Sequence, residues 1–121
     1  MVKRGVHEIL WDKSIGRWEI NRTHDFMNRM RVGFGATWLK NKDYLMVSGG
    51  YTICFQVSDE CEVYKFKATK KERKWTKISS MNEKRTAHSI CEVDQYVYAF
   101  GGLDQNEKSL NSIERLRLPS V

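Results

Sequence analysis

Residues 85–102 have the sequence RTAHSICEVDQYVYAFGG. Two short runs in this stretch, Ser89 to Val93 and Tyr96 to Phe100, are rich in the β-branched and aromatic residues that favour strands. The polar pair Asp94-Gln95 separates the two runs, and two glycines follow the second one. This pattern predicts a β-hairpin that ends at a glycine pair.

The same pattern occurs earlier in the chain. Arg31 begins a segment in which an apolar run leads to the polar residues 40–43, a second run from Tyr44 to Val47, and another pair of glycines. In both copies a loop follows the glycine pair, and a glutamate then stands at the same distance from the first glycine: Glu62 in one copy and Glu114 in the other. The hairpin therefore belongs to an internal repeat of about fifty residues.

The ordered residues of this repeat resemble those of kelch-repeat proteins. The kelch pattern has an arginine, two apolar strands, Gly-Gly, a loop, a glutamate with an aromatic residue two places later, and a tryptophan and a methionine before the next arginine. The chain matches it in order with Arg31, Gly49, Gly50, Glu62, Tyr64, Trp75, Met81 and Arg85, and then with His88, Tyr98, Gly101, Gly102 and Glu114. Leu116 departs from the pattern at the aromatic position, and Phe34 stands where the second copy has His88.

The resemblance implies an all-β fold made of β-propeller blades, with about two to two and a half repeats. Residues 1–30 are expected to form the third and fourth strands of a partial blade and a connection, residues 31–84 one complete four-stranded blade, and residues 85–121 the first three strands of another partial blade. Closed propellers have about four to eight blades. We therefore expect a fragment or an incomplete propeller that is covered by the rest of a longer polypeptide or by partner subunits.

Several packing roles follow from the repeat. The glycine pairs are expected to adopt positive φ and to leave room for a neighbouring aromatic residue, which the resemblance identifies as Trp75. A glutamate inside an apolar strand needs a partner, and the repeat offers Arg31 for Glu62 and Arg85 for Glu114. In the first connection, Phe26 or Met30 is expected to pack as Met81 does in the next copy.

Composition indicates one small folded domain. Hydrophobic residues make up 40% of the 121 residues, aromatic residues make up 12%, and there is a single proline. No apolar run has the length of about 20 residues that a membrane-spanning helix needs, so we expect no membrane partner. The odd number of cysteines, Cys54, Cys61 and Cys91, lacks a Cys-x-x-Cys spacing and predicts neither a disulfide framework nor a zinc site. Reduced thiols favour a cytoplasmic location.

Catalysis is not predicted. The charged residues Glu62, Glu114, Arg31 and Arg85 recur once per repeat, whereas a catalytic constellation is normally assembled once. The sequence contains no phosphate-binding glycine loop, no Ser-His-Asp order and no metal-ligand cluster. We therefore predict no catalytic residues, no cofactor and no metal.

The net charge of +6 needs a separate explanation. Basic residues concentrate in one expected hairpin, opposed there only by Glu72: Lys65, Lys67, Lys70, Lys71, Arg73, Lys74 and Lys77. Nucleic acid or an acidic protein surface could bind such a run. We favour a solvated hairpin tip, because no aromatic residues of the kind that stack on bases are interleaved there.

These observations favour a non-catalytic protein–protein interaction or scaffold module. The resemblance is compatible with cytoskeletal, ciliary or ubiquitin-ligase adaptor assemblies; the alternatives are a basic subunit of a nucleic-acid-containing assembly or part of a propeller enzyme. The loops at residues 51–60 and 103–111 should emerge on the face opposite the lysine-rich tips. Kelch resemblance assigns partner contacts to that loop face, where our candidates are Tyr51, Gln56, Asp104 and Gln105.

Overall fold

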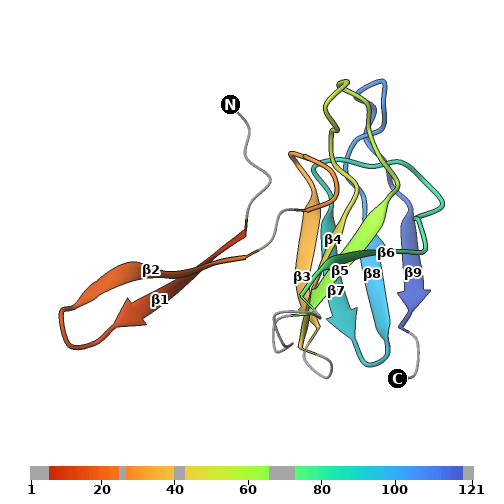
Figure 1. Cartoon of the computed structure of the whole chain (residues 1–121). Helices are drawn as coiled ribbons and strands as arrows, with labels where there is room; N and C mark the ends of the chain where they lie inside the picture. The colour runs from red at the N-terminus through yellow and green to blue at the C-terminus, as the bar shows by residue number, and fades with distance from the viewer. Residues whose placement is uncertain (1–5, 25–26, 40–42, 66–72, 119–121) are drawn as a thin grey trace.

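The computed structural model describes residues 6–24, 27–39, 43–65 and 73–118, and its described part consists of antiparallel strands without helices (Figure 1). The strands are β1 (Val6–Asp12), β2 (Arg17–His24), β3 (Gly35–Leu39), β4 (Tyr44–Ser48), β5 (Cys61–Lys65), β6 (Trp75–Ile78), β7 (Ser89–Val93), β8 (Tyr96–Phe100) and β9 (Ile113–Arg117). They form three sheets in the orders β1-β2, β3-β4-β5-β6 and β7-β8-β9. The predicted all-β class is confirmed.

The predicted hairpin is formed by β7 and β8. Ser89 pairs with Phe100 at one end and Val93 with Tyr96 at the other, so the turn is the pair Asp94-Gln95. Asp94 has a φ of 56°, in the left-handed region that short hairpin turns require and that aspartate tolerates. Local sequence was therefore sufficient to define this element.

The main core lies between the four-stranded and the three-stranded sheets. Apolar side chains from both sheets meet there: Leu39, Met46, Cys61, Ile90, Val97, Ala99 and Leu118. The first strands of the two sheets, β3 and β7, run close to each other. In β8, Val97 and Ala99 point into this core, and Tyr96, Tyr98 and Phe100 alternate with them on the other side of the sheet. Both sides of the strand are therefore apolar, which agrees with its almost continuous apolar sequence.

A second cluster covers the other face of the four-stranded sheet. Tyr64 of β5 is fully buried, and its ring lies 5.2 Å from the ring of Trp75 of β6, which is its direct cross-strand neighbour. Val47 and Met27 complete the buried cluster. Met27, and not Met30, thus supplies the packing expected in the first connection, whereas Phe26 lies outside the described residues.

The expectation that Trp75 lies against the glycine pair is wrong. A Cβ atom at Gly49 would meet the carbonyl oxygen of Arg85 at 2.3 Å and His88 Cε1 at 2.7 Å. The space beside Gly49 is therefore filled by the start of the next repeat, and the space beside Gly50 is filled by Val32 and Phe34. Trp75 packs on Tyr64 instead, because the β5–β6 register places the two rings opposite each other.

The β1–β2 hairpin projects away from the other two sheets (Figure 1). Trp11 and Trp18 face each other across it with ring centroids 5.4 Å apart, in the same cross-strand relation as Tyr64 and Trp75. Here, however, the tryptophans are 49% and 67% exposed. A cross-strand aromatic pair is thus buried in the four-stranded sheet, whereas the pair in this hairpin is exposed to solvent.

Candidate interaction surface on the loop face

Arg31 connects the end of β4 with the start of β5 through hydrogen bonds and an ion pair. Its guanidinium donates hydrogen bonds to the carbonyl oxygens of Gly49 (2.8 Å) and Glu60 (3.0 Å) and forms an ion pair with Glu62 Oε2 at 2.7 Å. Both side chains of this pair are almost completely buried. The predicted pairing of Arg31 with Glu62 is confirmed.

Arg85 makes the equivalent contacts in the next repeat. It donates to the carbonyl oxygens of Gly101 (2.9 Å) and Ser112 (3.1 Å) and pairs with Glu114 Oε2 at 2.8 Å, which confirms the second predicted pair. Burial alone would raise the pKa of Glu114, but hydrogen bonds from the Arg85 guanidinium and from the backbone amides of Asn82 and Glu83 lower it below its ordinary value. The carboxylate therefore remains charged in the fold.

An asparagine that the sequence analysis did not single out completes each unit. The backbone N–H of Asn28 donates to Glu62 Oε1 at 3.1 Å, and that of Asn82 donates to Glu114 Oε1 at 2.5 Å. Each asparagine follows a methionine and precedes the arginine by three positions, so the chain contains Met-Asn-x-x-Arg twice, at residues 27–31 and 81–85. That repeated signal could have identified Met27 as the packing residue.

The two loops anchored by these units have the same backbone conformation. In one loop Thr52 N donates to Gln56 O and Phe55 N donates to Thr52 O; in the other, Asp104 N donates to Lys108 O and Glu107 N donates to Asp104 O. Phe55 and Glu107 share a positive φ, of 54° and 61°. Identical scaffolds therefore present different side chains.

The difference is concentrated at the loop tips. Ile53 and Phe55 are 71% and 83% exposed, with the exposed Cys54 between them. The corresponding residues of the second loop include the polar Gln105 and Glu107. A phenylalanine in the left-handed region is unusual and costs free energy, and its ring gains no burial within the described chain in return. We call Ile53, Cys54 and Phe55 the apolar tip.

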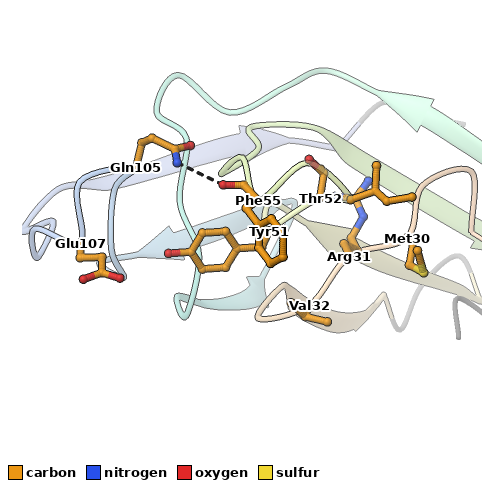
Figure 2. Close-up of a pocket in the computed structure, with 9 residues that line it drawn as sticks. Met30, Arg31, Val32, Tyr51, Thr52, Phe55, Gln105 and Glu107 are labelled. Carbon is orange, nitrogen blue, oxygen red and sulfur yellow. Dashed lines mark hydrogen bonds between the residues drawn. The ribbon is translucent and has the colours of Figure 1, made fainter. Parts of the chain in front are cut away.

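A hollow of about 650 Å³ opens beside the apolar tip (Figure 2). Its lining is formed by Met30, Arg31, Val32, Tyr51, Thr52, Ile53, Phe55, Gln105 and Glu107. Gln105 joins the two loops: its Oε1 accepts from Val57 N at 2.7 Å, and its Nε2 donates to Phe55 O at 3.2 Å. The hydrogen bonds of Gln105 thus attach the second loop to the backbone of the first loop, whose apolar side chains stay exposed.

Comparison with protein families identifies a known motif in one part of this scaffold. Residues 84–118 match the family model described as Kelch motif. The chain contains a kelch repeat. The predicted resemblance is confirmed, and the antiparallel sheets with arginine-fastened glycine pairs agree with kelch-type blades. Kelch repeats are in general non-catalytic protein-interaction modules. A search of curated proteins gave no match.

The four partner candidates have different places on the kelch loops. Tyr51 and Gln105 line the hollow together. Gln56 is exposed, but its carbonyl closes the first loop. Asp104 caps its own loop by accepting from Asn106 N at 2.8 Å and Lys108 N at 3.0 Å. Whether any of the four contacts a partner stays a prediction.

Sequence reasoning missed the apolar tip and Val32, which is 47% exposed at the edge of the hollow. A signal was available, since Ile53 and Phe55 are large apolar residues in a segment that the sequence predicts to be a loop. The tip of the lysine-rich hairpin, residues 66–72, lies outside the described residues. At its base, Lys77 pairs with Glu60 at 3.0 Å.

Burial determines the charge state of two titratable side chains in the core. His88 is buried, with Nε2 2.8 Å from Ser48 Oγ, and burial together with the Arg85 charge lowers the pKa of its imidazole to about 4. Burial raises the pKa of the Cys61 thiol to about 11, so this cysteine is protonated at neutral pH. Among the described residues, no group of three or more histidine, cysteine or acidic side chains could hold a metal ion. That part of the chain also has no helix suited to crossing a membrane.

Proposed function

We propose that this chain is a non-catalytic kelch module that binds a protein partner with the apolar tip and the hollow beside it. The observation that carries the proposal is the exposure of Ile53 and Phe55, at 71% and 83%, on a loop that hydrogen bonds hold in place. Large apolar side chains in such positions are typical of interaction sites.

The composition of the surface supports a protein partner. Aromatic residues such as Tyr51 and Phe55 are enriched among the side chains that dominate binding energy, and Val32 and Ile53 add apolar area beside them. Polar groups of Gln105 and Glu107 form the rim. Because Gln105 already fixes the backbone of the apolar tip, little loop ordering would oppose association.

We further propose that the module acts as a scaffold within a larger propeller or a multiprotein assembly. Cytoskeletal, ciliary and ubiquitin-ligase adaptor assemblies remain the settings that kelch resemblance favours. The three cysteines are free, which supports a reducing, cytoplasmic setting. Exposed apolar residues on both the apolar tip and the β1–β2 hairpin support a chain that works in contact with other polypeptide surfaces.

The test compares two isoleucine-to-serine variants. Ile53→Ser alters the apolar tip, and Ile15→Ser makes the same change at the exposed turn of the β1–β2 hairpin, where Ile15 is 51% exposed. Proteins captured from a cell extract by immobilised wild type and by each variant are quantified by mass spectrometry. We expect a specific set of proteins to be lost with Ile53→Ser and kept with Ile15→Ser. Equal capture by all three baits would contradict the proposed site.

A second variant separates the apolar tip from its support. Gln105→Ala removes the hydrogen bonds to Val57 N and Phe55 O while leaving every apolar side chain in place. If a rigid loop contributes to binding, the same proteins should be captured with reduced yield. Gln95→Ala is the matched control, because Gln95 is exposed at the β7–β8 turn, outside the two loops, and only its backbone carbonyl accepts a hydrogen bond.

A further inference from the structure

The loop face has a second hollow in addition to the one beside the apolar tip. It has a volume of about 410 Å³ and is formed by residues of the second loop, by Asp59 at the end of the first loop, and by the segment 82–84. Gln105 belongs to the lining of both hollows. The two hollows therefore lie next to each other, where the two loops meet.

The second hollow is acidic, although the chain as a whole has a net charge of +6. Among the described residues, its lining contains three carboxylates and one exposed cation: Asp59, Glu83, Asp104 and Lys84. Glu83 pairs with Arg85 at 3.2 Å, but the same guanidinium also pairs with Glu114, so these three side chains together keep a negative charge. No described cation forms an ion pair with Asp59 or Asp104. We call this site the acidic hollow.

The polar end of the hollow beside the apolar tip has the same sign of charge. Glu107 is exposed there beside Gln105, at the end opposite Met30 and Val32 (Figure 2). Arg31 is the cation among the described lining residues, and its guanidinium is buried in the ion pair with Glu62. A partner that fills this hollow with an apolar group therefore meets the carboxylate of Glu107 next to it.

Both hollows lie beyond the ends of the strands. Figure 1 shows the two loops, residues 51–57 and 103–110, side by side at one end of the two larger sheets, and the hydrogen bonds of Gln105 connect them. Blades of a propeller pack on each other through the faces of their sheets. This end of the molecule therefore stays accessible when the chain is part of a larger propeller.

We propose that this surface binds a basic, extended segment of a partner protein. An apolar side chain of the segment fills the hollow beside the apolar tip, and a neighbouring lysine or arginine enters the acidic hollow. Carboxylates accept strong, charge-assisted hydrogen bonds from these cations, and an acidic segment would bring like charges together. The inference rests on the proposed function and specifies the chemistry of the partner.

The sign of the charge makes the inference testable. A net charge of +6 acting from a distance would favour acidic peptides, whereas the local carboxylates favour basic ones. The experiment selects short random peptides displayed on phage against the immobilised full chain. We expect the enriched peptides to combine a large apolar residue with a nearby lysine or arginine. Binding of a labelled enriched peptide should weaken as salt concentration rises, because salt screens the attraction between opposite charges.

Two variants remove single carboxylate charges from the site. Asp59→Asn acts in the acidic hollow, where only the backbone carbonyl of Asp59 accepts a hydrogen bond from Met81 N. Glu107→Gln acts at the end of the other hollow. Each should weaken binding of the labelled peptide roughly three- to five-fold. Asp94→Asn is the matched control and should leave binding unchanged, because Asp94 is exposed at the β7–β8 turn and asparagine tolerates its φ of 56°.

Variants of the apolar tip distinguish failure of this inference from failure of the proposed function. Ile53→Ser should weaken peptide binding at least about five-fold, and Ile15→Ser should leave it unchanged. Acidic or uncharged peptides that still depend on Ile53 would overturn the basic partner and leave the proposed function intact. Basic peptides that bind equally well to Ile53→Ser would contradict both.

Two further outcomes would overturn the inference alone. One is binding of basic peptides that neither Asp59→Asn nor Glu107→Gln weakens, because the cation would then bind elsewhere. The other is absence of any enriched peptide with a wild-type chain whose circular dichroism shows folded β structure. In that case a short basic segment is not the group that fills these hollows.

Discussion

At the scale of single residues, the glycine pairs show how closely the repeats approach each other. Gly49 has a φ of 61°, and a Cβ there would lie 2.3 Å from the carbonyl oxygen of Arg85, which itself accepts a hydrogen bond from Gly50 N at 2.9 Å. Gly101 has a similar φ of 57°, but its Cβ would meet Leu110 O at 3.3 Å. Equivalent glycines thus have different steric surroundings, because Gly49 faces the next repeat.

Alanine substitutions separate the cost of a positive φ from the cost of a steric clash with the next repeat. Gly101→Ala should reduce the free energy of unfolding by about 1–2 kcal/mol, the cost of a left-handed φ for a residue with a Cβ. Gly49→Ala should cost more by at least about 2 kcal/mol, since the backbone of the next repeat must also move. Urea denaturation of both variants measures the difference. Equal losses would mean that the contact between Gly49 and Arg85 O does not limit packing.

His88 makes stability depend on pH. Because burial and Arg85 lower its pKa to about 4 in the fold, the unfolded chain, with an ordinary value near 6.5, takes up the proton first as pH falls. The free energy of unfolding should therefore decline between about pH 6.5 and about pH 4, and this group adds no further change below that range. Glu60 and Glu114, whose pKa values are lowered, stay ionised through most of this window.

The measurement compares urea midpoints near pH 7.5 and near pH 5 for the wild type and for His88→Gln. Glutamine can replace the Nε2 contact with Ser48 Oγ and does not titrate. We expect the wild type to lose more stability than the variant between the two pH values. The same loss in both proteins would assign the pH dependence to other groups.

At the scale of structural elements, the two arginine–glutamate pairs join strand ends that are distant in sequence. The pair of Arg31 and Glu62 has side-chain exposures of 1% and 3%, whereas the Glu114 side chain is 15% exposed and its partner Arg85 also contacts Glu83 at 3.2 Å. The first pair is thus the more deeply buried one. Removal of its carboxylate would leave a buried charge without its ion-pair partner.

Glu62→Gln should consequently destabilise the chain by about 3–5 kcal/mol, and Glu114→Gln by clearly less. Chemical denaturation of the two variants is the measurement. The double variant Arg31→Met with Glu62→Leu serves as the control, because it leaves no unpaired charge. It also removes the hydrogen bonds that Arg31 donates to Gly49 O and Glu60 O, so only part of the loss should be recovered. A larger effect at Glu114 would reverse our ranking of the two pairs.

At the scale of the whole molecule, the exposed surface is large for the chain length. The accessible surface is 8393 Å², whereas a compact monomer of 14.3 kDa has about 6800 Å². The β1–β2 hairpin with its exposed tryptophans, the apolar tip and the partly exposed residues Tyr96, Tyr98 and Phe100 all contribute. The sheets of the described chain therefore have exposed surfaces that could be buried in contacts with other polypeptides.

We accordingly expect the isolated chain to self-associate or to bind a hydrophobic dye such as ANS. Exposed aromatic residues and unpaired strand edges favour both outcomes. Sedimentation velocity and dye fluorescence at several concentrations provide the measurement. A monomer that binds no dye and unfolds in one sharp transition would show that the surfaces are tolerated in water without a partner.

The sequence by itself determined the features that depend on local pattern and on repetition. Two runs of β-branched and aromatic residues around the polar pair Asp94-Gln95 defined the hairpin and its turn. The repeated spacing of glycine pairs and charged residues predicted that Arg31 and Arg85 pair with Glu62 and Glu114. Such features are predictable because strand pairing follows side-chain periodicity, and because a buried carboxylate requires a cation wherever it occurs.

Only the tertiary structure decided which surfaces face solvent. Trp75 packs on Tyr64 because of the β5–β6 register, and the contact of Gln105 with Phe55 depends on two loops meeting across fifty residues of sequence. The row from Tyr96 to Phe100 looks like ordinary core in the sequence, yet it lies on the uncovered side of its sheet. Alternation specifies two faces of a strand, but the packing of one sheet against another determines which face is buried.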